Sequence, residues 1–228
     1  MKVVLGLSGG MDSAALCAYY IDNGYRVVPI NFNYGSKHNK YEAEAASKLA
    51  KYFKLPEIKQ IDLPFIGKDF TSHLLKEGGA IPEGHYKDKN MSLTVVPGRN
   101  IIFISIMAGY AWSIGAQVVA YGAHAGDHEI YEDCRPEFFH AMSMAISTGT
   151  GKRVSLEAPF LNFTKRDILN SGRLCNPPVP WELTRTCYKD QPISCGKCGS
   201  CVERREAFQL LDMYDPIPYE DDKRVPRR

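Results

Sequence analysis

The sequence has no strong excess of charge of either sign. Lys and Arg together number 28, Asp and Glu together number 26, and the formal net charge is +2. Proteins dedicated to nucleic acids usually carry a much stronger basic bias or a basic stripe. The charge balance therefore favours a small-molecule substrate and predicts no stable nucleic-acid partner.

Long hydrophobic runs are also missing. The longest apolar stretch, residues 101–116, is shorter than the ~20 residues that a membrane span needs, and it contains Ser105, Tyr110 and Ser113. No secretory signal is recognisable after Met1, because Lys2 leads directly into a strand-like stretch. These features predict a cytoplasmic chain without a membrane partner, and a buried helix at 101–116.

Cysteine is present, but without the spread pairs of a secreted disulfide framework. Four of the seven cysteines fall in one short segment: Cys187, Cys195, Cys198 and Cys201. Two overlapping Cys-x-x-Cys steps with glycines between them let neighbouring sulfurs converge on one ion at ~2.3 Å. We predict a structural Zn²⁺ held by four thiolates. An iron–sulfur cluster and a redox pair are the alternatives.

Short apolar runs alternate with helical patterns through most of the chain. We expect strands at residues 2–7, 27–33, 58–63, 117–122 and 154–156, and helices at 13–22, 37–53, 101–116, 137–147 and 164–172. Such alternation is typical of an α/β fold in which a parallel sheet is covered by helices on both faces. The expected architecture is a doubly wound, Rossmann-like sheet.

The chain divides into a large α/β domain and a small appendage. Residues 1–175 carry the alternating pattern, interrupted at about 64–94 by an excursion that is either a lid over the sheet edge or a plain surface loop. Residues 176–214 are rich in proline and cysteine and end in a helix at 202–214. Residues 215–228 are charged and broken by prolines, which predicts a disordered tail.

A glycine-rich loop follows the first strand. It consists of Leu7, Ser8, Gly9, Gly10, Met11, Asp12 and Ser13. Glycines after a strand let backbone N–H groups approach a ligand, and the helix that follows directs its positive end to the same place. The loop lacks the lysine of a Walker A motif. We predict a phosphate site in which Asp12 holds Mg²⁺ or positions the loop; an ordinary serine–glycine turn is the alternative.

The motif at residues 8–13 resembles the Ser-Gly-Gly-x-Asp-Ser loop of the PP-loop ATP pyrophosphatases. The resemblance implies a parallel sheet between helices, with ATP held by its pyrophosphate on the loop. It also implies that ATP is split at the α phosphate and that a substrate oxygen becomes an adenylate.

Further motifs are more selective than the loop. They lie at residues 33–38, 96–100, 133–138, 159–165 and 181–184, followed by the cysteine segment. In this order the set resembles the 7-cyano-7-deazaguanine synthase family from Val3 to about Phe208. The resemblance implies that ATP and ammonia convert 7-carboxy-7-deazaguanine to the nitrile through an adenylated acid and an amide. It also implies a homodimer.

Cations are needed where charge develops on the phosphate that is transferred. Arg99 and Lys165, together with Asp12 of the loop, are the catalytic candidates, and Arg135 is a cation expected beside the substrate. For each cation, a surface salt bridge is the alternative interpretation.

Four further residues are assigned to the substrate. Tyr34, Lys37 and His38 follow the carboxyl end of a strand and are expected to line the cleft. Asp133 carries a carboxylate that can accept hydrogen bonds from the edge of a guanine-like ring.

The stretch at residues 123–128 departs from the family pattern. His124, Asp127 and His128 suggest a metal site, although solvated loop residues are the favoured interpretation. Three functional alternatives remain: a tRNA-modifying enzyme of the thiolase type, a ligase that stops at the amide, and a zinc-stabilised nucleotide-binding module without activity.

Overall fold

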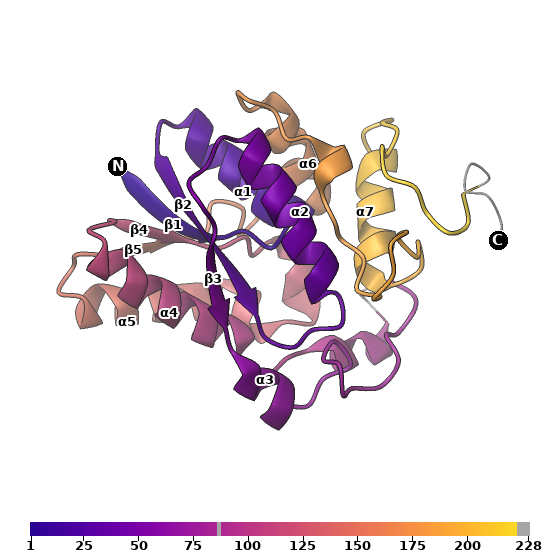
Figure 1. Cartoon of the computed structure of the whole chain (residues 1–228), viewed down its shortest axis with the longest axis horizontal. Coiled ribbons are helices and arrows are strands. Elements are labelled where there is room, and N and C mark those ends of the chain that lie inside the picture. Colours follow the sequence, from indigo (N-terminus) through magenta and orange to yellow (C-terminus); the bar gives the residue numbers. More distant parts are fainter. Residues whose placement is uncertain (86–87, 223–228) are drawn as a thin grey trace.

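The computed structural model describes residues 1–85 and 88–222, and its centre is a five-stranded parallel sheet. The strands follow the order β3-β2-β1-β4-β5 (Figure 1). They are β1 (Lys2–Gly6), β2 (Arg26–Asn33), β3 (Lys59–Asp62), β4 (Val118–Ala120) and β5 (Ser155–Glu157). The predicted doubly wound parallel sheet is confirmed.

Helices cover both faces of the sheet (Figure 1). One layer contains α1 (Met11–Asp22), α2 (Asn39–Tyr52) and α6 (Lys165–Leu174), with α7 (Gly199–Gln209) packed beside α6. The other layer contains α4 (Arg99–Ser113) and α5 (Pro136–Gly149). The short helix α3 (Pro64–Asp69) follows β3 at the sheet's edge.

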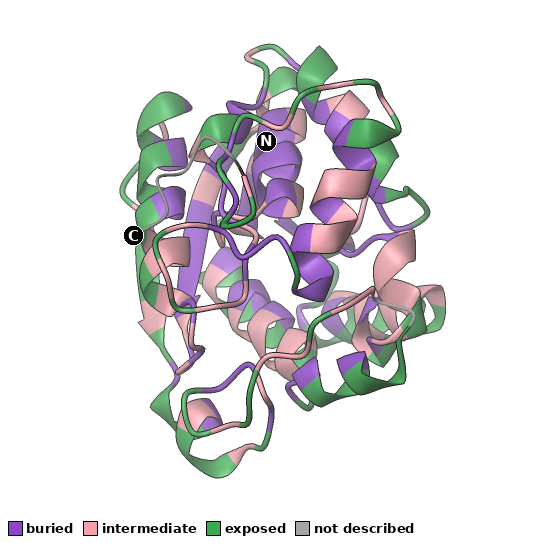
Figure 2. Ribbon diagram, turned by 90° about the vertical axis from the view of Figure 1, so that its right-hand side faces the viewer, coloured by how far each residue is buried: buried purple, intermediate pink, exposed green. Residues whose placement is uncertain are grey.

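The central strand β1 shows why two layers form. Val3 and Leu5 pack into the cluster with α1 and α2, whereas Val4 packs into the cluster with α4, and all three are fully buried. Side chains alternate between the two faces of a strand, so an uninterrupted apolar run requires a covering layer on each side. Burying each such side chain stabilises the fold by ~1.5–3 kcal/mol. Figure 2 shows the resulting buried interior beneath exposed outer helix surfaces.

Local capping explains where some helices begin and end. Thr164 starts α6 with a capping box, in which its side chain and that of Asp167 each accept a backbone N–H. Gly24 follows α1 with a φ of +75°, as expected of the residue that ends it. The last helix spans residues 199–209 rather than the expected 202–214, because the chain turns after Leu210, and Asp212 has a φ of +51°.

The excursion between α3 and α4 runs from the sheet edge to the cysteine segment. The ammonium group of Lys37 anchors its first part by donating to the carbonyls of His73 and Gly78, each at 3.0 Å. Further along, the N–H of Gly84 donates to the carbonyl of Lys197 at 2.9 Å. Residues 86–87 of the excursion lie outside the described residues. The excursion therefore joins two parts of the fold that are far apart in sequence.

Residues 215–222 differ from the disordered tail expected from the sequence. Asp215 accepts two hydrogen bonds from the guanidinium of Arg204, at 2.8 and 2.9 Å, and Ile217 and Tyr219 are buried against the cysteine cluster. Charge and proline content gave no indication of this docking, because it depends on the buried arginine of α7. Residues 223–228 of the expected tail lie outside the described residues.

Among the described residues, the structure contains no helix that is both long and apolar enough to cross a membrane.

Candidate active site

The glycine-rich loop turns sharply where β1 ends. Gly9 has a φ of +92°, and a Cβ atom at this position would lie 2.6 Å from the backbone oxygen of Glu42. Ser8 Oγ accepts the N–H of Gly10 at 3.2 Å, and Ser13 Oγ donates to the carbonyl of Gly10 at 3.1 Å. Glycine is therefore required at position 9 for both conformation and space. The loop leads directly into α1, whose N-terminus favours a bound anion.

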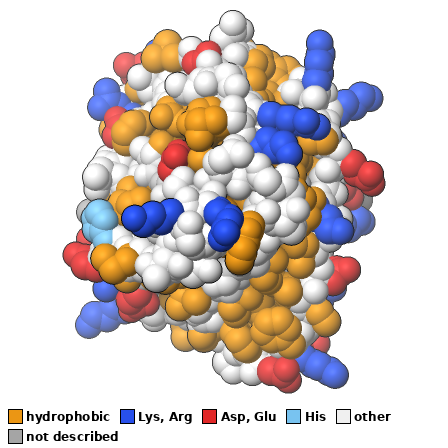
Figure 3. All heavy atoms as spheres, turned by 90° about the vertical axis from the view of Figure 1, so that its left-hand side faces the viewer, with side chains coloured by type: hydrophobic (Ala, Val, Ile, Leu, Met, Phe, Trp, Pro, Cys, Tyr) orange, Lys and Arg blue, Asp and Glu red, His pale blue; other side chains and the backbone are white. Residues whose placement is uncertain are grey.

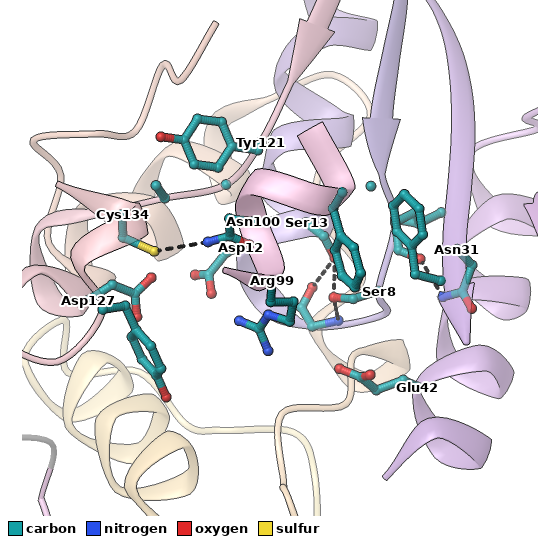
Figure 4. Close-up of a pocket in the computed structure, with 18 of the residues that line it drawn as sticks. Ser8, Asp12, Ser13, Asn31, Glu42, Arg99, Asn100, Tyr121, Asp127 and Cys134 are labelled. Carbon is teal, nitrogen blue, oxygen red and sulfur yellow. Dashed lines mark hydrogen bonds between the residues drawn. The ribbon is translucent and has the colours of Figure 1, made fainter. Parts of the chain in front are cut away.

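A cavity of about 230 Å³ lies beside this loop, at the carboxyl ends of the central strands (Figure 4). Ligands of open α/β sheets bind at this edge. Its lining includes many of the residues assigned to a site from the sequence: Leu7, Ser8, Gly10, Asp12, Ser13, Tyr34, His38, Arg99 and Lys165. The fold thus brings residues from opposite ends of the chain to one space.

Asp12 and Lys165 form an ion pair in the cavity wall. Lys165 Nζ lies 2.7 Å from both carboxylate oxygens of Asp12 and 3.1 Å from Oε2 of Glu203. Burial raises the pKa of Asp12, but the ammonium of Lys165 and the nearby His124 together outweigh this effect, so the pKa lies below its ordinary value. Burial lowers the pKa of Lys165, but Asp12 and Glu203 reverse the effect and raise it. Both groups are therefore charged at neutral pH.

The loop at residues 123–128 differs from the solvated loop expected from the sequence. His124 is fully buried, with Nε2 2.9 Å from Lys165 Nζ and 3.4 Å from Oδ2 of Asp127. Asp127 lines the cavity. The solvated interpretation was therefore wrong for His124. The sequence could not reveal this burial, because Lys165 is brought there by α6 from much later in the chain.

The opposite part of the cavity carries Arg99 and Glu42. The guanidinium of Arg99 lies over the ring of Tyr34, with Nη1 3.4 Å from the phenol oxygen, and no carboxylate among the described residues lies within 4.0 Å of it. Burial raises the pKa of Glu42 to about 8 although Arg99 and Arg185 oppose the shift. Burial lowers the pKa of His38 to about 3, so this histidine is neutral. Arg99 is thus free to meet an anion.

Several predicted site residues lie outside the cavity. Met11 belongs to the hydrophobic core, Gly9 shapes the loop from behind, and Lys37 anchors the excursion. Asp133 accepts the backbone N–H of Asn100 at 2.9 Å, at the start of α4. Arg135 donates through Nε to the carbonyl of His128 at 2.8 Å. These contacts give Lys37, Asp133 and Arg135 positions in the supporting structure of the site.

The cysteine segment and the two residues before it supply cavity residues that were not predicted from the sequence: Arg185, Thr186, Tyr188 and Ser200. The backbone N–H of Arg185 donates to the carbonyl of Gly9 at 2.7 Å. Glu42 was also missed, although it follows His38 by one helical turn and so shares its helix face. That spacing was a usable signal, whereas nothing in the sequence reveals that the cysteine segment returns to the glycine loop.

The four clustered cysteines are buried, and their sulfurs all lie within 4.8 Å of one another. Sulfurs bound at ~2.3 Å around one tetrahedral ion are ~3.8 Å apart, so the set fits such an ion. Backbone N–H groups of residues 189 and 195 lie 3.4 Å from Sγ of Cys187, and that of residue 198 lies 3.3 Å from Sγ of Cys195. These donors favour thiolates. The cluster can therefore bind a metal ion.

Comparison with known proteins gives a match over nearly the whole chain. Residues 2–212 match the model of the family described as "Queuosine biosynthesis protein QueC". The 7-cyano-7-deazaguanine synthase of Caldicellulosiruptor saccharolyticus is 45% identical over 220 residues, which are 96% of each chain. The synthase of the same name from Methanoregula boonei is 44% identical over 96% of this chain and 100% of its own.

Solved structures show the same fold at low sequence identity. The U34-tRNA thiolase NcsA from Methanococcus maripaludis, solved with its 4Fe–4S cluster, has a TM-score of 0.51 and 16% identity, over 99% of this chain and 76% of its own. The NMN synthetase of Francisella tularensis also has a TM-score of 0.51 and 16% identity, over 93% of this chain and 77% of its own.

Proposed function

Because the chain belongs to the queuosine biosynthesis protein QueC family, we propose that it is an ATP-dependent ligase that makes 7-cyano-7-deazaguanine. The proposed substrates are 7-carboxy-7-deazaguanine and ammonia. ATP first adenylates the carboxylate, and ammonia displaces AMP to give the amide. A second adenylation, on the amide oxygen, then allows loss of AMP and leaves the nitrile.

One observation carries the proposal: Lys165 meets the glycine loop through Asp12 at the edge of a cavity. A carboxylate oxygen is a poor leaving group and AMP is a good one, so the difficult step is transfer of the α phosphate. That step needs fixed cations and N–H donors at the developing charge. Lys165, Arg99 and the start of α1 provide them around one space.

The glycine loop, Leu7 to Ser13, is the proposed binding site for the pyrophosphate part of ATP. Arg99 has no carboxylate partner among the described residues, which supports its contact with the substrate or the α phosphate. Tyr34 and His38 line the same side. Asp133 caps α4 next to Arg99, and we propose that it positions this helix rather than the ring edge of the substrate.

Two metals are part of the proposal. Zn²⁺ suits the cysteine cluster, because four thiolates saturate a tetrahedral ion and leave no open position for chemistry. Mg²⁺ is proposed to arrive with ATP, bound mainly through phosphate oxygens. Both oxygens of Asp12 accept from Lys165, so Asp12 in this arrangement does not fit a direct Mg²⁺ ligand.

We further propose a cytoplasmic homodimer without a stable nucleic-acid partner. The near-neutral charge supports the absence of a nucleic-acid partner. Ile101 and Trp112 on α4 and Met144 on α5 are exposed apolar side chains of one helix layer, and Figure 3 shows hydrophobic side chains gathered on the lower half of the face that it views. Contiguous apolar surface of this kind is typical of subunit interfaces.

The test is to incubate the protein with ATP, Mg²⁺, ammonium and 7-carboxy-7-deazaguanine, and to follow AMP, pyrophosphate, amide and nitrile by mass spectrometry. We expect all four products, and no turnover when Asp12 is replaced by alanine. ATP that remains intact in the presence of the acid would refute the proposal. Amide that accumulates without nitrile would instead identify a ligase that stops halfway.

A further inference from the structure

Asp127 is a carboxylic acid in the cavity wall to which the proposed function has given no role. It lies in the turn between β4 and α5, and its side chain is 18% exposed. Figure 4 shows it beside Asp12 and Cys134, on the opposite side of the cavity from Ser8 and Glu42. It therefore faces the space beyond the ion pair of Asp12, away from the outer end of the glycine loop.

A continuous series of contacts connects Asp127 to the glycine loop. Asp12 of the loop holds Lys165 at 2.7 Å, and Lys165 Nζ lies 2.9 Å from Nε2 of His124. That nitrogen lies 3.4 Å from Oδ2 of Asp127. The acid is thus separated from the cation expected at the α phosphate by a single buried imidazole ring. Asp127 and Lys165 both line the cavity, and we expect a carbonyl group attached to that phosphate to lie in the same cavity.

Three carboxyl groups surround Lys165, and they differ in their availability. Asp12 accepts from Lys165 with both oxygens, and Glu203 lies 3.1 Å from Lys165 and does not line the cavity. Asp127 lines the cavity, and among the described residues no Lys or Arg nitrogen lies within 4.0 Å of its carboxylate, whereas Nε2 of His124 lies 3.4 Å from it. Of the three, only Asp127 has oxygens that can turn to a ligand without breaking the ion pair.

The groups around Asp127 also make it a better base than an exposed aspartate. Burial is the main cause that raises its pKa; His124 and Lys165 oppose the rise, and Glu203 and Asp12 add to it. Tyr131 and Cys134 face it from the neighbouring 3₁₀ turn. A general base works best when its pKa is close to the working pH. The surroundings shift Asp127 in that direction.

We propose that Asp127 is the general base that accepts the proton of ammonia in the amide-forming step, and that His124 is its positioning residue. The inference rests on the proposed function. The nitrogen attacks the acyl carbon of the adenylate, a C–N bond forms, the C–O bond to the phosphate breaks, and AMP leaves with that electron pair. The proton lost by the nitrogen passes to the carboxylate of Asp127 and from there to solvent.

His124 fixes where this carboxylate lies. The ring is fully buried, and its Nδ1 accepts the backbone N–H of Gly126 at 3.1 Å. Its Nε2 touches both Lys165 and Asp127. A buried ring held on both sides keeps the base at a constant distance from the cation, which precise proton transfer requires.

The test separates adenylation from amide formation in the full-length protein. Asp127→Asn keeps the size of the side chain, and Glu129→Gln removes the same charge from an exposed residue of the same turn. ATP–pyrophosphate exchange that depends on 7-carboxy-7-deazaguanine measures adenylation. Amide release with ammonium, and hydroxamate release with hydroxylamine, measure attack on the adenylate.

We expect Asp127→Asn to keep its exchange rate and to lose amide formation by about 10²–10⁴-fold, the usual contribution of a general base. Hydroxamate formation should fall less, because hydroxylamine is the weaker base and its nitrogen gives up a proton more readily. Glu129→Gln should resemble the wild type in all three assays. Equal losses of exchange and amide in Asp127→Asn would overturn the proposal, as would an unchanged amide rate.

A wild type without any acid-dependent exchange would overturn the proposed function itself, which is a different result. The role of His124 is tested by His124→Asn. His124 lowers the pKa of Asp127. The pH at which amide formation is half-maximal should therefore be higher in His124→Asn than in the wild type, when the two are compared at the same ammonium concentration. An unmoved midpoint would show that the histidine is only structural.

Discussion

Replacing Arg204 of α7 with methionine should strongly destabilise the protein. All five guanidinium N–H groups are used in a fully buried site. Two donate to Asp215 at 2.8 and 2.9 Å, two to the hydroxyls of Thr184 and Thr186 at 2.6 and 3.1 Å, and one to the carbonyl of Trp181 at 3.0 Å. The guanidinium thus joins α7, the docked residues after it and the entry to the cysteine segment.

The expected loss in the free energy of unfolding depends on the carboxylate of Asp215, which stays largely buried after the guanidinium is removed. Removing one partner of a buried ion pair costs about 3–5 kcal/mol, because the other charge stays buried without compensation. Asp215 would still accept the hydroxyl of Tyr219 at 2.6 Å and the N–H of Ile217 at 3.3 Å. The loss should therefore lie near the lower end, about 3 kcal/mol. For a chain of this size that lowers Tm by roughly 6–12 °C.

The neighbouring residue provides the control. Arg205 pairs with Asp221 at 2.9 Å, but the two side chains are 39% and 45% exposed, so Arg205→Met should cost about 0–1 kcal/mol. The assay is urea unfolding followed by circular dichroism and by the fluorescence of Trp181, which is buried beside Arg204. Losses that are equal in the two variants, or below about 1 kcal/mol for Arg204→Met, would refute the reasoning.

Four further changes should have distinct effects. Gly9→Ala should weaken ATP binding at least about 10-fold in a titration, since it strains a positive φ and places a Cβ 2.6 Å from a backbone oxygen; an unchanged Kd would contradict the loop geometry. Lys165→Met should lower acid-dependent ATP–pyrophosphate exchange by about 10²–10³-fold, and a loss below threefold would exclude the assigned role. The pKa of Glu42 is raised from 4.5 to about 8, so the folded wild type should lose stability as pH rises from 4.5 to about 8, because the buried carboxyl group must ionise. The urea midpoint of the wild type should therefore fall over this pH range relative to that of Glu42→Gln, and the difference should stay constant above pH 8. A difference between the two midpoints that does not change with pH would show that the pKa shift is absent. Cys195→Ser should abolish metal binding and also weaken ATP binding, and elemental analysis of the wild type should give about one zinc per chain; iron in its place would overturn the metal assignment.

The sheet and its helices could be predicted from the sequence because the signals that define each element lie within that element or next to it. Apolar runs such as Lys2–Gly6 and Val118–Ala120 are buried on both faces, and helices such as Lys165–Leu174 carry their own caps. Neither feature depends on a distant partner. Covering helix layers then follow from general rules for parallel sheets, whereas the strand order β3-β2-β1-β4-β5 comes from the structure.

The site was only partly predictable because its residues depend on distant partners. Asp12 and Lys165 could be proposed from motifs, and the structure places them together. The sequence around His124 is that of a polar loop, and its burial depends on Lys165 of α6, which lies far downstream in the sequence. Asp127 and Asp133 lie in the same connection between β4 and α5. Asp133 nevertheless caps α4, whereas Asp127 lines the cavity. Spacing alone cannot distinguish these two uses of an aspartate.

The hydrogen bond from the backbone N–H of Arg185 to the carbonyl of Gly9 also has a consequence for the order in which the parts of the cavity form during synthesis. A ribosome makes the chain from its N-terminus, so the glycine loop emerges long before residue 185 does. A nascent or truncated chain that stops before residue 185 would contain every residue of the loop and still lack the donor to Gly9. Under the proposed function, the ATP site is completed only when Arg185 has folded back onto the loop, which ties ATP binding to the folding of a segment far downstream in the sequence.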